Sequence, residues 1–485
     1  MKNRIALVVV VGVCIMQVAC QPRQGRWNSL LEKQGKWNAT VTPSTFAWNE
    51  EGLVCSGEPG YLVWEGGKPY VDFELVAEIQ TAPGSFAQIL FHQSLPFDSS
   101  TVKGYGVVVA GSTGQVSEPA LAMKTGSLYG VRNLYYPMVA DGEWFTLTVR
   151  VSGNLTETFV NGTRVMEYIQ PGQPWRGSAT GGRLLSSGTF AVHHQAGTVK
   201  LKSLKVKRLP PGEQIPLKVE ETWDAQVTRL MEAHFPLIDF HVHLKGGLTI
   251  EQAIENSQQL GINYGIAPNC GLKFPVTDDI SLAAYMDTVR GKPIFRGMQA
   301  EGREWITLFS PEAIAKFDYV FTDALTFTDY KGRRNRIWIP EEVWVDNKQQ
   351  FMDQLTGKIE AIFSQEPVDI YVNPTLLPAS LKPEYDQLWT PERIDRVIAV
   401  LKKNNVAIEI NARYKIPSPA FIRKAKEAGL KFSFGTNNGA ANLGRLEYCL
   451  QMIDECGLTP ADMFFPKVHE EKPVLVKGLP PAITG

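Results

Sequence analysis

The sequence predicts two main folded domains, an all-β sandwich followed by a parallel (β/α)7 barrel. Apolar and polar residues alternate with period two through most of residues 26–208, which is typical of antiparallel sheets. From residue 235 onward, short apolar strands alternate with helical patterns, which implies parallel strands joined by helices. The break between the two regions is Leu209-Pro210-Pro211-Gly212-Glu213, where proline cannot donate to a strand ladder.

Length and charge limit the classes of function. The chain has 485 residues, 44% of them hydrophobic and 20% charged, which is ordinary for a globular protein of two or three domains. Its 49 basic and 50 acidic residues leave a formal net charge of −1. Nucleic acid is therefore not an expected partner, because bulk binding of nucleic acid depends on a basic face that neutralises phosphates.

Residues 1–19 have the pattern of an export signal. Lys2 and Arg4 precede an uncharged, mostly apolar run that is too short to span a bilayer comfortably. The segment ends in Val18-Ala19-Cys20 and resembles a bacterial lipobox, which implies lipidation of Cys20 and a tether over residues 20–25. A plain signal peptide is the alternative. We expect a periplasmic or outer-membrane protein of a bacterium that contacts the membrane through its lipid anchor only.

Cysteine spacing predicts no disulfide framework. Cys55 and Cys270 fall in different predicted domains. Cys449 and Cys456 are seven residues apart on a predicted helix, a rise of about 10.5 Å. That exceeds the roughly 7 Å limit between the Cα atoms of a bridged pair.

The sandwich is predicted from six strands separated by turn-forming residues. Asn161-Gly162 predicts a tight hairpin turn, and His193 and His194 should face opposite sides of a strand. The predicted strands are residues 70–79, 86–91, 104–109, 144–151, 157–160 and 199–206.

This region resembles the 3-keto-disaccharide hydrolase family, whose domain is a concanavalin-like jelly roll. The motifs that carry the resemblance are Asp72-Phe73-Glu74-Leu75, Thr125-Gly126-Ser127-Leu128-Tyr129-Gly130, Gly142-Glu143-Trp144, Val160-Asn161-Gly162 and the strand from Val199 to Leu209. The family usually places polar and acidic residues where this chain has Gly106, Val108 and Gly111. These residues argue against glycoside cleavage by the sandwich and leave sugar binding by exposed Trp and Tyr as one interpretation. For any single aromatic residue, the favoured alternative is a place in the sandwich core.

The second domain, residues 235–477, is predicted to contain seven parallel strands. It follows a linker over residues 209–234 and precedes a tail over residues 478–485. The predicted strands are residues 237–243, 262–267, 293–301, 319–323, 368–373, 406–411 and 431–436, and helical patterns cover residues 249–260, 348–363, 391–404 and 418–428. Seven strands are one fewer than the usual eight-stranded barrel.

The first of these strands ends in His241-Val242-His243. Side chains alternate along a strand, so the two histidines should point the same way, about 6.6 Å apart along the chain. Both imidazoles would then reach one metal ion. The alternative is a half-buried strand with two satisfied histidines. Gly246-Gly247 and a helical pattern from Thr249 place the pair where the strand ends, which favours the metal site.

The opening motif Ile238-Asp239-Phe240-His241-Val242-His243 and the count of seven strands resemble the polymerase and histidinol phosphatase superfamily. The resemblance implies a metal cluster at the carboxyl ends of the strands, with His241, His243, Glu301 and Glu409 matching ligand positions. The other expected histidine positions hold Asn269-Cys270, Thr322-Asp323, Asn373-Pro374 and Gly435-Thr436-Asn437-Asn438.

The remaining donors suffice for one divalent metal, or for two if a carboxylate bridges. Zn or Mn suits this mixture of nitrogen and oxygen ligands. The implied chemistry is activation of water by the metal with a carboxylate as general base, for which we select Asp323 first and Glu409 second. The alternative is structural ion pairing, Glu301 with Arg303 and Glu409 with Arg413.

The connection from Ala324 to Asp346 is long for a loop between a strand and a helix, and such loops are often lids or binding segments. It contains four cations, Lys331, Arg333, Arg334 and Arg336, together with Trp338 and Trp344. These residues suit an anionic substrate or sugar stacking, or they belong to a solvated loop with no role. The candidate substrate-binding residues are Lys245, Asn269, Arg303, Arg334, Asn373, Arg413 and Asn437.

Three hypotheses about function follow from the sequence. The first is an exported metal-dependent hydrolase of a carbohydrate or a phosphorylated small molecule, with a sandwich that binds glycans. The second is a catalytically inactive glycan-binding protein of the cell envelope. The third is cleavage of 3-keto-glycosides by the sandwich itself.

Overall fold

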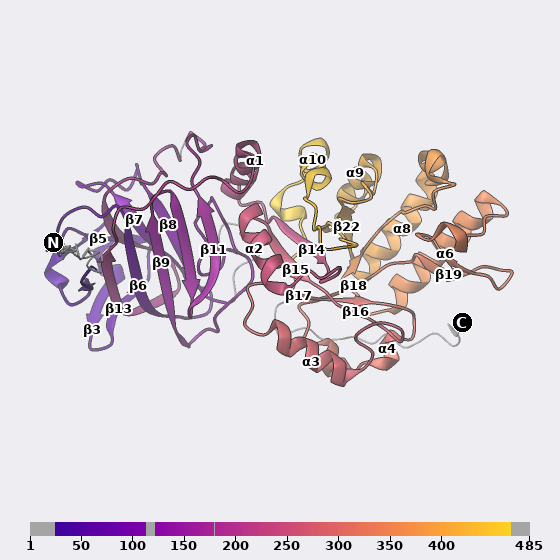
Figure 1. Ribbon diagram of the computed structural model, residues 1–485, viewed down its shortest axis with the longest axis horizontal. Helices are drawn as coiled ribbons and strands as arrows, with labels where there is room; N and C mark the ends of the chain where they lie inside the picture. Colours follow the sequence, from indigo (N-terminus) through magenta and orange to yellow (C-terminus); the bar gives the residue numbers. More distant parts are fainter. Residues whose placement is uncertain (1–24, 113–121, 179, 467–485) are drawn as a thin grey trace, which may run out of the picture.

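The computed structural model describes residues 25–112, 122–178 and 180–466. It confirms the predicted fold class, an antiparallel β-sandwich followed by a closed barrel of seven parallel strands. Figure 1 shows the sandwich and the barrel one after the other along the long axis of the molecule. The predicted signal segment with Cys20, and the predicted tail over residues 478–485, lie outside the described residues.

The sandwich consists of two sheets. One has the strand order β11-β10-β9-β6-β13-β4-β3, with β1 added to β13, and the other has the order β2-β5-β12-β7-β8. The strands are β1 (Asn28–Ser29), β2 (Trp37–Thr40), β3 (Phe46–Asn49), β4 (Gly52–Ser56), β5 (Gly60–Trp64), β6 (Phe73–Thr81), β7 (Phe86–Gln93), β8 (Tyr105–Ala110), β9 (Trp144–Ser152), β10 (Leu155–Val160), β11 (Thr163–Ile169), β12 (Thr189–Ala196) and β13 (Thr198–Arg208).

The two-residue period has its clearest form in β6, where buried and half-buried side chains alternate over nine residues. Such a strand packs one face on the core and turns the other to solvent. The predicted hairpin turn at Asn161-Gly162 is confirmed, because both residues have positive φ, 48° and 80°, between the paired strands β10 and β11. His193 and His194 also face opposite sides, with His194 fully buried and His193 half-buried.

The barrel closes through the cyclic order β14-β15-β17-β18-β21-β22-β23, and the short strand β16 is added to β17. All of its pairings are parallel. The strands are β14 (Ile238–Val242), β15 (Asn263–Ile266), β16 (Asn269–Cys270), β17 (Phe295–Ala300), β18 (Tyr319–Thr322), β21 (Ile370–Tyr371), β22 (Ala407–Asn411) and β23 (Phe432–Gly435). A hairpin of β19 (Thr326–Thr328) and β20 (Arg334–Arg336) lies in the connection after β18.

Helices connect the barrel strands, and several begin with a side-chain cap. Thr249 caps α2 in a capping box with Gln252, and Thr390 and Ser418 cap α8 and α9 just before a proline at the first helical position. The helices are α1 (Glu221–Glu232), α2 (Ile250–Leu260), α3 (Asp279–Val289), α4 (Trp305–Leu308), α5 (Pro311–Ile314), α6 (Lys348–Gln365), α7 (Tyr385–Leu388), α8 (Pro391–Asn404), α9 (Pro419–Glu427) and α10 (Glu447–Cys456).

The two domains pack directly on each other through buried polar contacts. A salt bridge joins Arg132 of the sandwich to Asp224 on α1, with both side chains almost fully buried. The side-chain amide of Asn133 donates to the Met231 carbonyl at 2.8 Å, and Asn263 at the start of β15 donates to the Asn133 carbonyl at 2.9 Å. Breaking one partner of a buried charge pair is costly, so these contacts fix the sandwich against the barrel.

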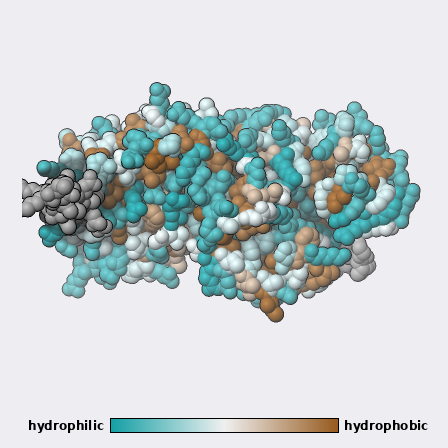
Figure 2. All heavy atoms as spheres, viewed as in Figure 1, coloured by the Kyte–Doolittle hydropathy of each residue, from teal (hydrophilic) through white to brown (hydrophobic). Residues whose placement is uncertain are grey.

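The face drawn in Figure 2 is mostly hydrophilic, and its apolar residues occur in small separate groups. In the part of the chain that the structure describes, no helix is both long and apolar enough to cross a bilayer. The four cysteines in that part are buried free thiols.

The sandwich should lose stability in acid through His193. Burial, and then the neighbouring His194, lower the pKa of His193 from 6.5 to about 4. The unfolded chain therefore binds this proton first, and stability falls as the pH falls from 6.5 to 4. His193 stacks on Tyr61 with ring centroids 4.0 Å apart. The variant His193→Phe keeps the stack but cannot bind the proton. Between pH 6.5 and pH 4, we expect its free energy of unfolding to fall by roughly 2 kcal/mol less than that of the wild type. Denaturant unfolding at the two pH values measures this difference. Equal losses in the two proteins would contradict this origin.

Candidate functional site

The candidate site begins at His243, just beyond the end of β14. Its Nδ1 lies 2.8 Å from the Ala267 carbonyl, and since a carbonyl only accepts, Nδ1 carries the proton. Burial, and then the charges of His241 and Lys245, hold the pKa of His243 well below its usual 6.5. The ring is therefore neutral at pH 7. Its Nε2 is a buried acceptor without a hydrogen-bond partner among the described residues.

His241 is oriented by a carboxylate. Its Nδ1 lies 2.6 Å from Oε1 of Glu409 on β22, and both side chains are 1% exposed. The other oxygen of Glu409 accepts from the backbone N–H of Asn373 at 2.6 Å and from the side-chain amide of Asn411 at 2.9 Å. Because its neighbours are all donors, Glu409 acts as an acceptor, and Nε2 is the free nitrogen of His241. That atom is also buried without a partner in the described structure.

The two rings lie edge to face, with centroids 5.1 Å apart and planes at 81°. A register shift between Asp239 and Val242 in the pairing of β14 with β15 accompanies this arrangement. Such bulges often redirect side chains next to functional sites. The side chain of Asp239 accepts from the His241 backbone N–H at 3.0 Å and from the Thr436 hydroxyl at 2.6 Å, which joins β14 to β23.

Two acidic side chains lie at neighbouring strand ends beside the histidines. Glu301, after β17, accepts from the side-chain amide of Asn269 at 2.6 Å. Burial, and then the charge of Asp323, raise the pKa of Glu301 to about 8. Burial also raises the pKa of Asp323, which follows β18, and the charge of His241 opposes this rise. Lys245 is close enough to lower the pKa of Glu301 by its charge.

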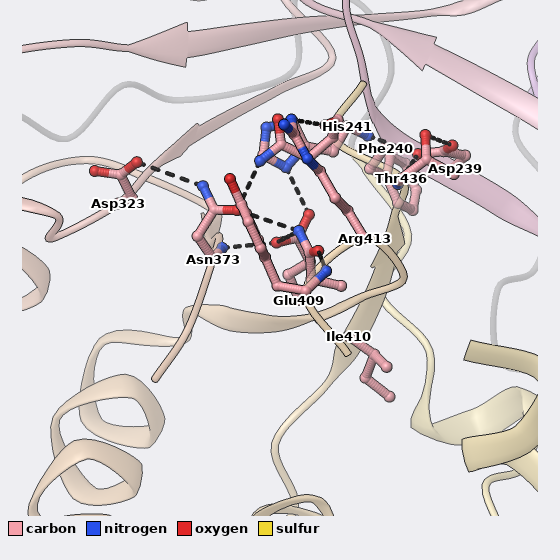
Figure 3. Close-up of polar contacts among 12 residues, drawn as sticks. Asp239, Phe240, His241, Asp323, Asn373, Glu409, Ile410, Arg413 and Thr436 are labelled. Carbon is pink, nitrogen blue, oxygen red and sulfur yellow. Dashed lines mark hydrogen bonds and ion pairs between the residues drawn. The ribbon is translucent and has the colours of Figure 1, made fainter. Parts of the chain in front are cut away.

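Asparagine side chains connect the other strand ends, and Figure 3 labels one of them, Asn373. The Asn373 side chain lies between Asp323 and Glu409, and its Nδ2 is 3.5 Å from Asp323 Oδ2. Its oxygen accepts from Asn411 at 3.1 Å and from Asn437 at 2.8 Å. The network holds the ends of β18, β21, β22 and β23 together around the histidines.

The two arginines proposed as ion-pair partners of the carboxylates bind other groups. Arg303 pairs with Glu366 at 2.9 Å and donates to the Thr322 hydroxyl. Arg413 is exposed, donates to the Asn437 carbonyl at 2.9 Å and lies over the Tyr414 ring. The alternative pairings of Glu301 with Arg303 and of Glu409 with Arg413 are therefore absent from the described hydrogen bonds and ion pairs.

The long connection after β18 largely neutralises its own cations. Lys331 and Arg333 pair with Asp346, and Arg336 pairs with Glu342. Arg334 is exposed on β20. The charge of the predicted basic cluster is therefore largely balanced by acidic residues of the same loop, and its role in substrate binding stays a prediction.

The predicted site residues thus come together only in part. His241, His243, Glu301, Asp323 and Glu409 gather at the carboxyl ends of the strands, with Lys245, Asn269, Asn373, Asn437 and Arg413 around them. Within the described ranges, no three His, Cys, Asp or Glu side chains form a complete metal-holding group. Two unpartnered imidazole nitrogens are nevertheless a suitable pair of donors for a divalent ion.

Sequence analysis missed three supporting residues. They are Asp239, Asn411 and Asn438, the last of which accepts from the His243 backbone N–H at 2.7 Å and donates to its carbonyl at 2.8 Å. The available signal was a polar residue in or just after an otherwise apolar strand, since a buried polar group needs a partner.

The comparisons with known proteins address the sandwich most directly. Residues 26–207 match the family model of a 3-keto-alpha-glucoside-1,2-lyase-like domain. This match confirms the resemblance predicted for the first domain, and the lyase-like domain accounts for nearly the whole sandwich. No curated protein matches the chain significantly.

Three solved structures illustrate the fold neighbours of the chain. A candidate glycosyl hydrolase from Parabacteroides distasonis is 18% identical, covers 38% of this chain and 94% of its own, and has a TM-score of 0.33. A carbohydrate-binding module from Bacillus subtilis is 12% identical, with coverages of 38% and 97% and a TM-score of 0.24. Histidinol phosphate phosphatase from Lactococcus lactis is 12% identical, with coverages of 48% and 100% and a TM-score of 0.33.

The contact between His241 and Glu409 depends on Gly435 at the end of β23. A Cβ on Gly435 would overlap Glu409 Oε1 and lie 2.7 Å from Cβ of His241. We expect Gly435→Ala to lower the free energy of unfolding by about 1–3 kcal/mol, as overpacking does. The matched control is Gly357→Ala on α6, where a Cβ meets nothing within 4 Å and should stabilise the helix slightly. Thermal unfolding of both variants checks this, and equal stability would contradict it.

Proposed function

We propose that the protein is an exported metal-dependent hydrolase of carbohydrate-derived or phosphorylated small molecules, in which the lyase-like sandwich binds glycan. The observation that carries the proposal is the pair of buried ring nitrogens, Nε2 of His241 and Nε2 of His243, that have no partner among the described residues. An unpaired polar atom in a buried position is costly, and a bound ion would remove that cost at both atoms.

The nitrogen donors assigned to the ion are His241 and His243, and the third ligand assigned to it is Glu301, which is not placed with the two histidines as a metal-holding group in the described residues. This set resembles catalytic zinc sites, which have three protein ligands and keep one position open. The carboxylate of Glu409 and the carbonyl of Ala267 hold the opposite ring nitrogens, as outer groups do around metal-binding histidines. We therefore assign Glu409 an orienting role in place of the ligand and general-base roles considered from sequence.

A divalent ion, Zn or Mn, supplies Lewis-acid chemistry when bound and makes water a better nucleophile near neutral pH. In this proposal, Asp323 accepts the proton of the attacking water, held in place by Leu325 N–H at 3.1 Å and by Asn373. Lys245 and Arg413 supply positive charge for an anionic group of the substrate. The side chains of Asn269 and Asn437 supply amide groups next to the carboxylate and the histidines.

The carbohydrate part of the proposal is supported by the family match of the sandwich, whose description names a 3-keto-α-glucoside lyase. Cleavage of such a glucoside by the sandwich is less favoured, because β8 carries Gly106 and Val108 at positions where the family has polar residues. Export and lipidation of Cys20 remain part of the proposal on sequence grounds, since the basic start, apolar run and lipobox-like end support them.

A second candidate is a glycan-binding protein without catalysis. Protein donors already bind both carboxylates, Glu301 through Asn269 and Glu409 through His241 and Asn373. Carboxylates satisfied in this way can simply complete the polar interior of a barrel. Metal content separates the two candidates.

We expect the purified wild type to contain about one equivalent of Zn or Mn per chain by elemental analysis. The double variant His241→Asn with His243→Asn should contain almost none, because it lacks both nitrogen ligands. Hydrolysis of sugar phosphates and 3-keto-glycosides should be lost with the metal.

The matched control is His234→Gln, since His234 lies at the domain interface, 3.5 Å from the Tyr129 hydroxyl and outside the donor set. This variant should retain both metal and activity. A wild type that takes up no metal after incubation with Zn or Mn would favour the binding protein. Activity that survives in the double variant would belong to the sandwich.

Replacing Glu409 distinguishes an orienting group from a ligand. Glu409→Gln keeps the size of the side chain and one acceptor oxygen but loses the negative charge beside His241. We expect affinity for Zn to fall by about 10–100-fold, the range typical of outer groups, rather than to vanish. Glu312→Gln, an exposed charge change on α5, serves as the control. Unchanged affinity in Glu409→Gln would remove the orienting role, and calorimetric titration measures the difference.

A further inference from the structure

A cavity outside the barrel lies toward the free edge of the larger sandwich sheet, around the turn between β3 and β4. It has a volume of about 480 Å³ and is lined by residues from the N-terminal segment, the β3–β4 turn, β9 and β13. Trp48 and Trp144 contribute aromatic surface, and Gln34, Glu50, Glu51 and Lys202 contribute polar groups. The volume falls within the range of small-molecule sites.

Trp144 is turned away from the core between the sheets, whereas Trp48 packs in part against that core. Trp144 is the first residue of β9, on the half-buried to exposed side of an alternating strand, and is 37% exposed. Trp48 lies on the edge strand β3 and is half-buried. Trp is usually highly buried, so the exposed indole of Trp144, with the accessible part of Trp48 lining the same cavity, points to a ligand with apolar faces.

The backbone around the cavity is built for close approach. Gly52, which lines the cavity, has φ of 123°, and a Cβ there would collide with the carbonyl of Leu201 on β13. Glycine thus lets the turn between β3 and β4 pack against β13. The turn is also held by the Asn49 side chain, which accepts from the Glu51 N–H at 2.9 Å, and by the ion pair of Glu51 with Lys200 at 3.2 Å.

The charges of the cavity favour a neutral ligand. Lys202 is neutralised by Glu78 at 3.0 Å, and its ammonium lies 5.6 Å from the centre of the Trp144 ring. Glu51 is neutralised by Lys200, whereas Glu32 and Glu50 are exposed carboxylates on the rim. These carboxylates repel anions and accept hydrogen bonds from hydroxyl groups, where charge-assisted bonds are strong.

We propose that this cavity binds one or more units of a neutral saccharide, with the Trp144 indole against a C–H face of the sugar, the accessible part of Trp48 beside it, and the carboxylates and amides on its hydroxyls. The inference rests on the proposed function in one respect, that the sandwich recognises glycan. It adds which surface of the sandwich binds the glycan and that the glycan is neutral rather than anionic.

The site is separate from the barrel. The sheet order runs from β11 to β3, and β11 lies at the domain interface, where Arg164 donates to Gln258 of α2 at 3.0 Å. The edge strand β3 is at the opposite end of the sheet, as Figure 1 shows. A saccharide held there anchors the protein without occupying the barrel.

The test uses the full chain and isothermal titration with neutral tetrasaccharides, namely cellotetraose, maltotetraose and mannotetraose, and with anionic tetragalacturonate. We expect one or more of the neutral probes to bind, and Trp144→Ala and Trp48→Ala each to weaken that binding about tenfold or more. Trp27→Ala is the matched control, because Trp27 is 42% exposed on the same domain but lies outside the cavity. Its binding should equal that of the wild type.

Trp144→Phe should restore part of the affinity, and thermal unfolding of each variant checks the fold. If Trp144→Ala and Trp48→Ala both bind the neutral tetrasaccharides as tightly as the wild type does, the cavity is not the binding site. Glycan recognition elsewhere on the sandwich would remain possible in that case. Stronger binding of tetragalacturonate would overturn the charge class. No binding of any probe would remove glycan recognition and the cavity together, whereas the metal content of the barrel would be unaffected.

Discussion

The hydrogen bond between Nδ1 of His241 and the Glu409 carboxylate determines what the barrel can do. It leaves the opposite ring nitrogen of His241 buried without a partner, as Nε2 of the neighbouring His243 is, and it occupies the Glu409 carboxylate. The bond requires that no side chain stand at Gly435 on β23, between β14 and β22 in the sheet. The geometry of the site is therefore a property of three neighbouring strands rather than of the His-x-His motif alone.

The barrel was predictable because each of its strands carries its own signal. Short apolar segments separated by helices with capping residues, such as Thr249 and Ser418, are local features, and all seven strands occur where the pattern places them. Several sandwich strands were missed for the opposite reason. β2 and β5, for example, are short and lie side by side in the smaller sheet, and their existence depends on pairing partners distant in sequence.

The site was predictable only to the level of residue type. The spacing of His241 and His243 predicted that both rings face one region, because side-chain direction along a strand is local. The hydrogen-bond partners of Glu409 are His241 of β14 and the backbone of Asn373 after β21. The sequence does not show that these strands lie next to Glu409. The same limitation applies to the loop after β18, where Asp346 neutralises two cations that looked available. Contacts between residues that are distant in sequence decide whether a carboxylate binds a metal ion or orients a histidine, and the residue type alone does not.

The relation between the two domains gives the proposed activities a common physical basis. The buried pair of Arg132 and Asp224, with the amide contacts of Asn133 and Asn263, fixes β11 against the barrel, so the free edge of the large sheet points away from it. A glycan held at that free edge cannot reach the histidines directly. Under the proposed function, the barrel would act on a smaller molecule that diffuses to it, and the sandwich would keep the protein where such molecules are released.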